Sequence, residues 1–321
     1  MIQDEGIEKF LNHLKTPGTK ALYTYGLTEF QKFYQPQGTV SDFLDRVEED
    51  LKHSGWRERD LTAIDTLQAF ANYLEAKKLS PNSIRSYVSS VQRLCKFHQM
   101  PVSLLDVKLP DPTVQSKKHS WSLEQIGKFI ELFDDPMHKA QAAFLFQSGL
   151  SLVDNLSLEY QDISEEYEAE VTPICLDLTR HKTGIEFITF AGSWSVSLLR
   201  TYLEGKHLKP TDRLFQTTKE SVDAYFRVRG KQFLGSYSTA RNPCRPHSLR
   251  GAFKTLSNRA NVVENFIVEY FMGHNVHDMD KTYTSMDREG WRETYKLIEP
   301  YLDPRTLALQ HKPETPLAMV Q

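Results

Sequence analysis

The sequence predicts a mainly α-helical protein of two domains with one short β-hairpin. At 321 residues the chain is long enough for about two domains of ordinary size. Its 40% hydrophobic and 25% charged residues are typical of globular proteins and exclude disordered and collagen-like chains. Apolar residues recur at helical spacing, and only residues 174–178 and 185–190 are β-rich runs around a polar turn.

The first hundred residues predict helices separated by short breaks. Apolar positions within 7–14 and 22–33 indicate two helices on either side of Pro17-Gly18, and further helices are expected at 41–53, 61–78 and 81–97. Ser80 is expected to cap the last of these helices, with Pro81 in its first turn. Residues 1–105 are therefore predicted to form an all-α domain.

Prolines among polar residues then predict a linker at 106–118, followed by a second domain at 119–300. Within the second domain we expect a hairpin turn at 180–184 and helices at 123–133, 139–147, 193–204, 219–232, 247–260, 263–272 and around 283–300. For the C-terminal tail, 301–321, docking on a neighbouring subunit and disorder both stay open.

Apolar runs, the N-terminal residues and the cysteine spacing predict where the protein is located and how its cysteines are used. No apolar run approaches the roughly 18 residues of a membrane span, which predicts a soluble protein with no membrane partner. The N-terminus lacks a basic patch followed by an apolar segment, so a cytoplasmic protein is expected. Cys95, Cys175 and Cys244 are widely spaced and odd in number, which favours core thiols over disulfides or a cysteine zinc site.

Charge is unevenly distributed along the chain. The formal net charge of -3 argues against a nucleic-acid partner, but residues 77–118 hold a local excess of bases. Such asymmetry is typical of a DNA-facing surface, with a solvated helix face as the alternative. The candidate DNA-binding residues are Lys77, Lys78, Arg85, Arg93, Lys117 and Lys118.

The segment 246–286 carries most of the chemistry. His247 and Arg250 are three apart and would share a helix face, where two donors converge on one anion. Gly273 ends the following apolar run, His274 comes next, and Tyr283 stands nine residues later. With Lys182 on the hairpin turn, these residues indicate an anion-centred site with a hydroxyl nucleophile.

These segments resemble the tyrosine recombinase (phage integrase) family. HSLRGAFKTLSNRA is similar to the family's His-x-x-Arg helix, FMGHNVHDMDKTYTSM to its Leu-Gly-His and Tyr, RHKTG to its hairpin lysine, and FLFQSGLSLVDNLSLEYQDI to its Thr-Gly-Leu-Arg-x-x-Glu segment. LSPNSIRSYVSSVQRLCKF looks like part of the family's core-binding domain. The resemblance implies a two-domain C-shaped DNA clamp, with a helical core-binding (SAM-like) domain and a catalytic domain.

One position departs from the family pattern. Where the family has its first catalytic arginine, this chain has Ser151, which brings no charge. Arg180 is our candidate replacement, because it would share a strand face with Lys182 if the strand continues through the turn. Arg241 and Arg245 are less favoured alternatives.

The resemblance implies a site-specific DNA strand transferase. Tyr283 would attack the scissile phosphate to form a 3'-phosphotyrosyl bond, so neither ATP, metal nor another cofactor is required. Arg250, His247 and His274 would contact the phosphate, and Lys182 would protonate the leaving 5'-oxygen. Tyr295 and Tyr301 are next in line as nucleophiles.

The implied assembly is a homo-tetramer on two duplex DNA sites that exchanges strands through a Holliday junction, with an accessory directionality factor as a further partner that the resemblance allows. The early start of the helical domain favours a simple, Xer-like recombinase or a compact integrase. Integration or excision of a mobile element and dimer resolution share this chemistry and stay open.

Three other interpretations stay open. Loss of the first arginine would be compatible with a DNA-binding protein that no longer cleaves. A relaxing enzyme similar to type IB topoisomerases would share the tyrosine chemistry. A metal site would use His274, His277, Asp278 and Asp280, but nothing else nearby supplies a matched ligand set, and the family's Gly-His to Tyr spacing explains His274 better.

Overall fold

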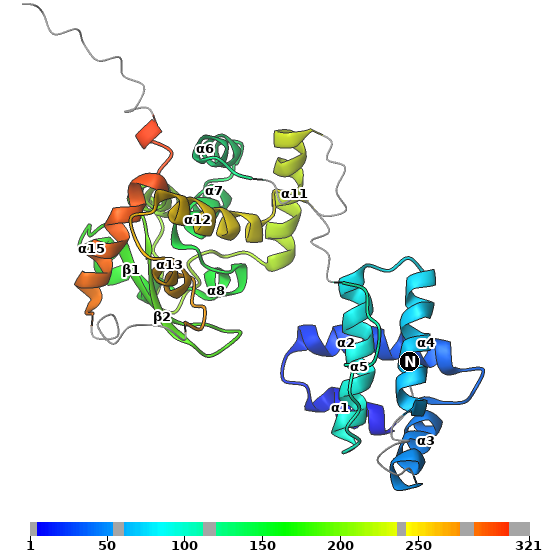
Figure 1. Ribbon diagram of the computed structural model, residues 1–321. Coiled ribbons are helices and arrows are strands. Elements are labelled where there is room, and N and C mark those ends of the chain that lie inside the picture. Colours follow the sequence, from blue (N-terminus) through cyan, green and yellow to red (C-terminus); the bar gives the residue numbers. More distant parts are fainter. Residues whose placement is uncertain (1–4, 54–60, 112–119, 236–241, 277–285, 308–321) are drawn as a thin grey trace, which may run out of the picture. The chain divides into compact units, whose positions relative to one another are not determined.

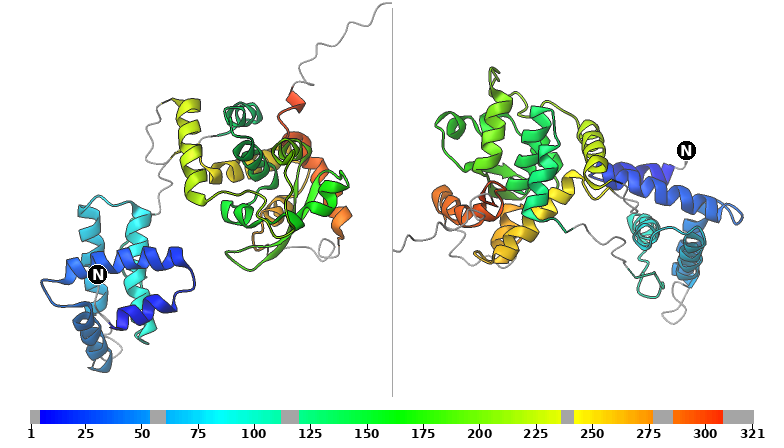
Figure 2. Two further views of the ribbon diagram at one scale, coloured as in Figure 1. Left: turned by 180° about the vertical axis from the view of Figure 1, so that it is seen from behind. Right: turned by 90° about the horizontal axis from the view of Figure 1, so that it is seen from above.

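In a computed structural model, the chain divides into two compact units, Met1–Lys117 and Lys118–Gln321. The structure describes residues 5–53, 61–111, 120–235, 242–276 and 286–307. Figures 1 and 2 show these residues as a mainly helical protein, in which the described part contains one two-stranded sheet. The predicted fold class, mainly α with one small hairpin, is thereby confirmed.

The described residues of the first unit form helices only. They are α1 (Glu5–His13), α2 (Pro17–Tyr34), α3 (Val40–His53), α4 (Leu61–Ala76) and α5 (Pro81–Phe97). The predicted cap of α5 is confirmed, since the Ser83 backbone N–H donates to Ser80 Oγ at 3.1 Å and Pro81 lies in the first turn. Residues 101–111 contain no helix or strand.

Aromatic side chains build the core of this unit. The ring of Phe30 on α2 lies 5.0 Å from that of Phe43 and 5.1 Å from that of Phe70, both edge-on. All three are fully buried, and full burial of such a side chain contributes about 1.5–3 kcal/mol. The helices are therefore joined by one shared core, to which α5 contributes Val88, Val91 and Leu94.

The second unit has more elements. Its helices are α6 (Leu123–Glu131), α7 (Pro136–Ser148), α8 (Leu152–Ser157), α9 (Ser164–Glu168), α10 (Ser193–Leu203), α11 (Lys219–Leu234), α12 (Pro246–Ala260), α13 (Asn265–Phe271) and α15 (Arg288–Ile298). Its strands are β1 (Ile174–Thr179) and β2 (Glu186–Ala191), and Tyr160–Asp162 and Glu299–Tyr301 are short 3-10 turns. The sequence predicted neither α8 nor α9, because helices this short show little periodicity.

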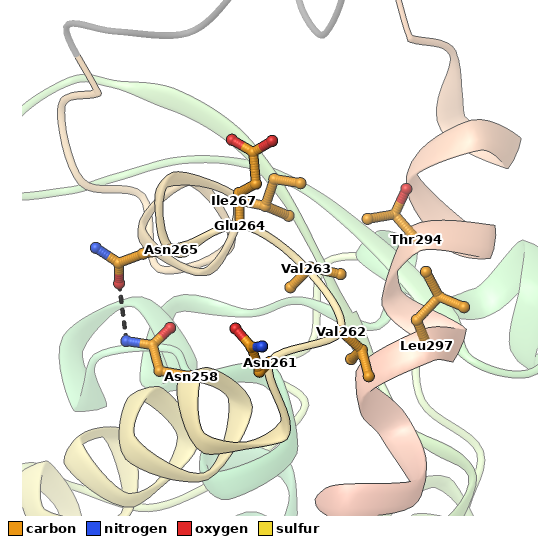
Figure 3. A pocket seen from close by; sticks show the side chains of 9 residues that line it. All are labelled: Asn258, Asn261, Val262, Val263, Glu264, Asn265, Ile267, Thr294 and Leu297. Carbon is orange, nitrogen blue, oxygen red and sulfur yellow. Dashed lines mark hydrogen bonds between the residues drawn. The ribbon is translucent and has the colours of Figure 1, made fainter.

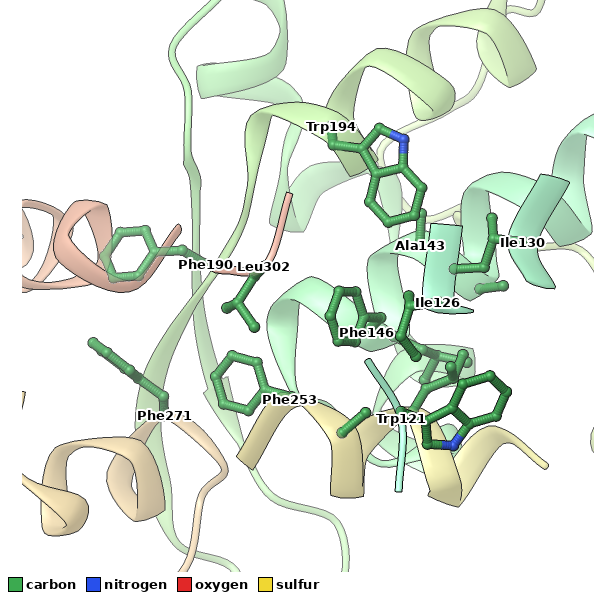
Figure 4. Packing of buried hydrophobic residues seen from close by; sticks show 14 of the residues in the cluster. Trp121, Ile126, Ile130, Ala143, Phe146, Phe190, Trp194, Phe253, Phe271 and Leu302 are labelled. Atoms are coloured by element: carbon green, nitrogen blue, oxygen red, sulfur yellow. The ribbon is translucent and has the colours of Figure 1, made fainter. Parts of the chain in front are cut away.

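Helix α7 lies at the centre of the second unit. Every residue from Ala140 to Ser148 is buried. The helix packs against α10 and α12 and contributes to two apolar clusters, through Phe146 in one and Phe144 in the other. A helix without an exposed polar face must be enclosed by other elements. Figure 4 shows Phe146 near Ile126 of α6 and Phe253 of α12 within the first of these clusters.

The hairpin pairs antiparallel, with Ile174 opposite Ala191 and Thr179 opposite Glu186. Helices α13 and α15 both pack against β2, so the end of α13 lies close to the hairpin (Figure 1). The three cysteines are buried and unpaired, which confirms the prediction of core thiols. Among the described helices, none combines the length and apolar character that crossing a membrane would take.

Candidate functional site

Arg250 is the centre of the candidate site. It lies in the second turn of α12 and is only 4% exposed. Its Nη1 donates to the carbonyl of Gly149 at the end of α7, and its Nη2 donates to the carbonyl of Met272 at the end of α13, at 2.6 Å. One buried guanidinium thus ties three helix segments together through carbonyls that helix ends leave without partners.

Two glycines allow these helix ends to approach Arg250. Gly149 and Gly273 have φ angles of +65° and +64°, in the left-handed region. A Cβ at Gly149 would lie 2.6 Å from the ring of Phe253, and one at Gly273 would lie 2.9 Å from the ring of Phe187. The glycines therefore provide both the turn and the space that the site needs.

His274 lies directly beside Arg250. Its Nε2 is 3.0 Å from Nη2 of Arg250, and its Nδ1 contacts a carboxylate oxygen of Glu269. The other carboxylate oxygen of Glu269 forms an ion pair with Lys254 of α12. Both ring nitrogens of His274 therefore have protein partners, and the ring is held in one orientation.

Arg180 reaches the same place from the hairpin. Its Nη1 donates to the carbonyl of Gly273 at 2.9 Å, the residue after the one whose carbonyl accepts from Arg250. The two guanidinium groups therefore lie side by side at the C-terminal end of α13, where exposed carbonyls favour positive charge. Among the described residues, the Nε of Arg180 is a buried donor without a hydrogen-bond partner.

The reason given for Arg180 from the sequence was wrong. The strand does not continue to Lys182, because β1 ends at Thr179 and Arg180 closes the hairpin. The backbone N–H of Arg180 donates to Ile185 O at 2.8 Å, and that of Gly184 donates to Arg180 O at 2.8 Å. Arg180 reaches the cluster because it stands at the base of the turn rather than because it shares a strand face with Lys182.

The electrostatics of the cluster are those of an anion site. Burial and, next, the positive charge of Arg180 lower the pKa of Arg250 from 12.5 to about 10, against the opposing effect of Asp154 and Glu269. The positive guanidinium groups of Arg180 and Arg250 repel each other; Asp154 and Glu269 partly offset this repulsion, and a bound anion would reduce it further. Planar guanidinium donors are well matched to the oxygens of a phosphate.

Ser151 has a local structural role. Its Oγ donates to Asp154 Oδ2 at 2.6 Å and accepts from the backbone N–H of Asp154 at 3.3 Å, which caps the short helix α8. Asp154 is 4% exposed and also accepts from the backbone N–H of His181 at 3.1 Å. This carboxylate therefore joins α8 to the hairpin turn, next to the guanidinium groups.

The remaining predicted catalytic residues lie around this cluster or outside the described residues. Lys182 is exposed on the hairpin turn, and His247 is exposed in the first turn of α12, three residues before Arg250. Tyr283, His277, Asp278, Asp280 and the alternative Arg241 lie outside the described residues. Arg245, the other alternative, precedes α12 and has a buried Nε without a partner among the described residues.

The two alternative candidate nucleophiles, Tyr295 and Tyr301, have different surroundings. Tyr295 is fully buried, and its hydroxyl donates to the carbonyl of Gln147 at 2.8 Å. Burial also raises the pKa of Tyr295 well above its ordinary value of 10.0, so its hydroxyl is a poor nucleophile. Tyr295 is therefore excluded on its surroundings, whereas Tyr301 is 45% exposed.

The predicted DNA-binding residues of the first unit have different surroundings. Lys77 forms an ion pair with Glu29 at 2.7 Å and lies over the ring of Tyr73, and Arg85 donates to the carbonyl of Pro110 at 3.0 Å. Lys78 and Arg93 are exposed. Lys117 and Lys118 lie outside the described residues.

Other potential sites do not compete with the arginine cluster. A pocket of about 670 Å³ at the far end of α12 contains none of the predicted site residues (Figure 3). It is lined by Asn258, Asn261, Val262, Val263, Glu264, Asn265, Ile267, Thr294 and Leu297. Among the described residues, no group of three or more His, Cys, Asp or Glu side chains has the arrangement of a metal site.

Sequence reasoning missed two acidic members of the cluster. Asp154 lies three residues after Ser151, within the segment already compared with the family, and Glu269 lies five residues before His274. Asp154 stands at the acidic position of the Thr-Gly-Leu-Arg-x-x-Glu segment, so that motif could have identified it. The spacing of Glu269 gives no such signal, and only its contact with His274 identifies it.

No family model matches the sequence, and no curated protein matches it. The structure is nevertheless similar to that of the XerH site-specific recombinase bound to its difH substrate, with a TM-score of 0.53 and 15% identity over 84% of this chain and 78% of that chain. It is also similar to the Tn1549 transposon integrase with transposon right-end DNA, with a TM-score of 0.50 and 16% identity over 84% and 97% of the two chains.

A lambda integrase dimer bound to a core site is similar as well, with a TM-score of 0.51 and 16% identity over 80% of this chain and 96% of that chain. At these identities the similarity concerns the fold. The chain has the tyrosine recombinase fold that these site-specific recombinases and integrases represent.

Proposed function

We propose that this protein is a site-specific DNA recombinase that cleaves and rejoins duplex DNA through a phosphotyrosine bond at Tyr283. The observation that carries the proposal is the convergence of Arg250, Arg180 and His274 at the C-terminal end of α13. Two guanidinium groups and an imidazole fit a phosphodiester better than a small neutral substrate. The DNA-bound structures of similar fold support duplex DNA as the partner.

The chemistry follows from the charges. The Tyr283 oxygen attacks the scissile phosphorus, a 3'-phosphotyrosyl bond forms, and the bond to the 5'-oxygen breaks. Arg250 and Arg180 hold the non-bridging oxygens and offset the charge that grows in the transition state. His247 handles the tyrosine proton, and Lys182, exposed on its turn, protonates the leaving 5'-oxygen.

Arg180 takes the place of the family's first arginine in this proposal. Ser151 stands at that position and is occupied as the cap of α8. Arg180 supplies a guanidinium from the hairpin instead, and its Nη1 donates to the carbonyl of Gly273. The reverse reaction, in which a partner strand's 5'-hydroxyl attacks the phosphotyrosine, completes strand exchange in a tetramer on two DNA sites.

A covalent trap tests the proposal. The protein is incubated with nicked duplexes drawn from the DNA that flanks its own gene, with a metal chelator present, and denaturing gels are searched for a protein–DNA adduct. We expect an adduct that Tyr283→Phe abolishes while duplex binding stays within about twofold of wild type, because only the nucleophilic oxygen is lost. An adduct that survives in Tyr283→Phe contradicts the assignment of the nucleophile.

A second candidate is a DNA-binding protein that does not cleave. It is favoured by one observation, the neutral Ser151 where the family has a charged arginine. Tight binding to duplexes that yield no adduct in either strand orientation would support this candidate over the recombinase.

A further inference from the structure

Within the part of the chain that the structure describes, Glu269 is the carboxylate that directly contacts His274 of the arginine–histidine cluster. Its two carboxylate oxygens contact His274 Nδ1 and Lys254 Nζ, and its side chain is 19% exposed. Its backbone carbonyl also accepts from the backbone N–H of His274 at 3.0 Å. The same residue therefore fixes both the backbone and the ring of His274.

The hydrogen bonds of His274 identify where its proton lies. The Nη2 of Arg250 is 3.0 Å from His274 Nε2, and a guanidinium group only donates. Nε2 must therefore present its lone pair, which leaves the ring proton on Nδ1, where Glu269 accepts it. In the protein without DNA, His274 is thus an acceptor toward Arg250 and a donor toward Glu269.

This arrangement must change when an anion enters. Phosphate oxygens accept hydrogen bonds, so a ring that contacts the phosphate through Nε2 needs a proton on that nitrogen. A second proton would give the ring a positive charge, which the nearby cations Arg250, Arg180 and Lys254 oppose. Glu269 is the carboxylate in direct contact with the ring, and Asp154 is the other acidic group that acts on this cluster.

We propose that Glu269 is a positioning residue for His274, one that holds the ring in the Nδ1–H tautomer and stabilises the doubly protonated ring that donates to the bound phosphate. Lys254 supports this role by keeping the carboxylate ionised. Lys254 lies four residues after Arg250 on the same face of α12. One helix face therefore carries both Arg250, which would bind the phosphate, and Lys254, which pairs with Glu269. Burial raises the pKa of Glu269, but hydrogen bonds from Lys254 and His274 outweigh it and hold that pKa below 4.5.

The role in catalysis rests on the proposed recombinase function, but the ring chemistry does not, so a first experiment uses no DNA. Side-chain nitrogen NMR of His274, assigned with His274→Gln, is recorded for the free protein and during titration with inorganic phosphate. We expect the Nδ1–H tautomer in wild type and a redistribution of the proton between the two nitrogens in Glu269→Ala. An Nε2–H tautomer in wild type, or the same spectrum in Glu269→Ala, would overturn the proposal.

A second experiment measures single-turnover cleavage of a nicked duplex. Glu269→Gln keeps the size of the side chain and removes its charge, and we expect cleavage to slow by about tenfold to a hundredfold, the range for groups that orient a histidine from behind. Because the ring then loses its counter-charge, the fall in rate with rising pH should begin at lower pH than in wild type. Duplex affinity should change less than about threefold, since Arg250 and Arg180 remain.

Two variants serve as controls. Glu264→Gln removes an exposed carboxylate at the start of the same helix and should leave rate and pH profile unchanged. Lys254→Met should give a smaller loss than Glu269→Gln in the same direction. Cleavage by Glu269→Gln at the wild-type rate and pH profile would refute the role of Glu269 but not the proposed recombinase function. A wild-type protein that never cleaves would refute the proposed recombinase function but not the NMR result on the tautomer of His274.

Discussion

Substitution of Arg180 by alanine should separate catalysis from stability. Loss of one preorganised donor to the charge that develops in a transition state slows a reaction by about a hundredfold to a thousandfold. We expect the cleavage rate of Arg180→Ala to fall by that factor. The folded state should lose little, because two effects oppose each other. The hydrogen bond from Nη1 to Gly273 O, 2.9 Å long, is lost, but Arg250 is relieved of a neighbouring positive charge that lowers its pKa.

The magnitude for stability follows from these two terms. A hydrogen bond that involves a charged donor contributes about 1.5–3 kcal/mol, and relief of like-charge repulsion in a partly buried site is of similar size. We therefore expect the free energy of unfolding of Arg180→Ala to differ from wild type by about 1 kcal/mol or less. Arg180→Lys keeps the charge without the planar fork and should recover part of the rate.

The assay combines urea denaturation, duplex binding and single-turnover cleavage of a nicked duplex. Arg213→Ala is the matched control, because Arg213 also donates to a backbone carbonyl in the same unit, that of Ser157, and pairs with Glu159 at 3.4 Å outside the cluster. It should leave cleavage unchanged. The double variant Ser151→Arg with Arg180→Ala asks whether an arginine at the family position restores activity.

Two results would refute this reasoning. Cleavage by Arg180→Ala at the wild-type rate would remove Arg180 from the phosphate site. A loss of stability well beyond 3 kcal/mol would show that Arg180 is a structural residue whose activity loss has no bearing on the chemistry.

Three further predictions concern the surroundings of the site. Tyr295→Phe should lower the free energy of unfolding by about 1–3 kcal/mol, measured by urea denaturation, because the buried Gln147 carbonyl loses its donor, and cleavage should survive. Gly273→Ala should destabilise by about 2 kcal/mol or more in the same assay, since an alanine at a φ of +64° is strained and its Cβ meets Phe187 at 2.9 Å. The pKa of Glu269 is held below 4.5, so its stabilising contribution is present above that pH and is lost as the pH falls through its folded-state pKa. Urea denaturation of wild type and Glu269→Gln from about pH 3 to 7 should therefore give free energies of unfolding that converge at low pH.

Much of the fold could be predicted because its signals are local. Helical periodicity, Ser80 with Pro81, and two β-rich runs around a turn located most of the described helices and the hairpin. The short helices α8 and α9 were missed, since fewer than two turns of helix give no clear period. The predicted turn at 180–184 was located correctly, but Arg180 and Lys182 share no strand face because β1 ends at Thr179.

Part of the candidate site could likewise be predicted from local sequence patterns, and part could not. The sequence by itself determined His247, Arg250 and His274 as candidates, because they stand at fixed spacings on or just after predicted helices. Only the tertiary structure decided that Arg180 lies beside Arg250 and that Glu269 holds His274. Those contacts join α7, the hairpin, α12 and α13 through buried helix ends. Packing of distant segments decides which charges meet, and the strength of a charge interaction depends on the burial that packing creates.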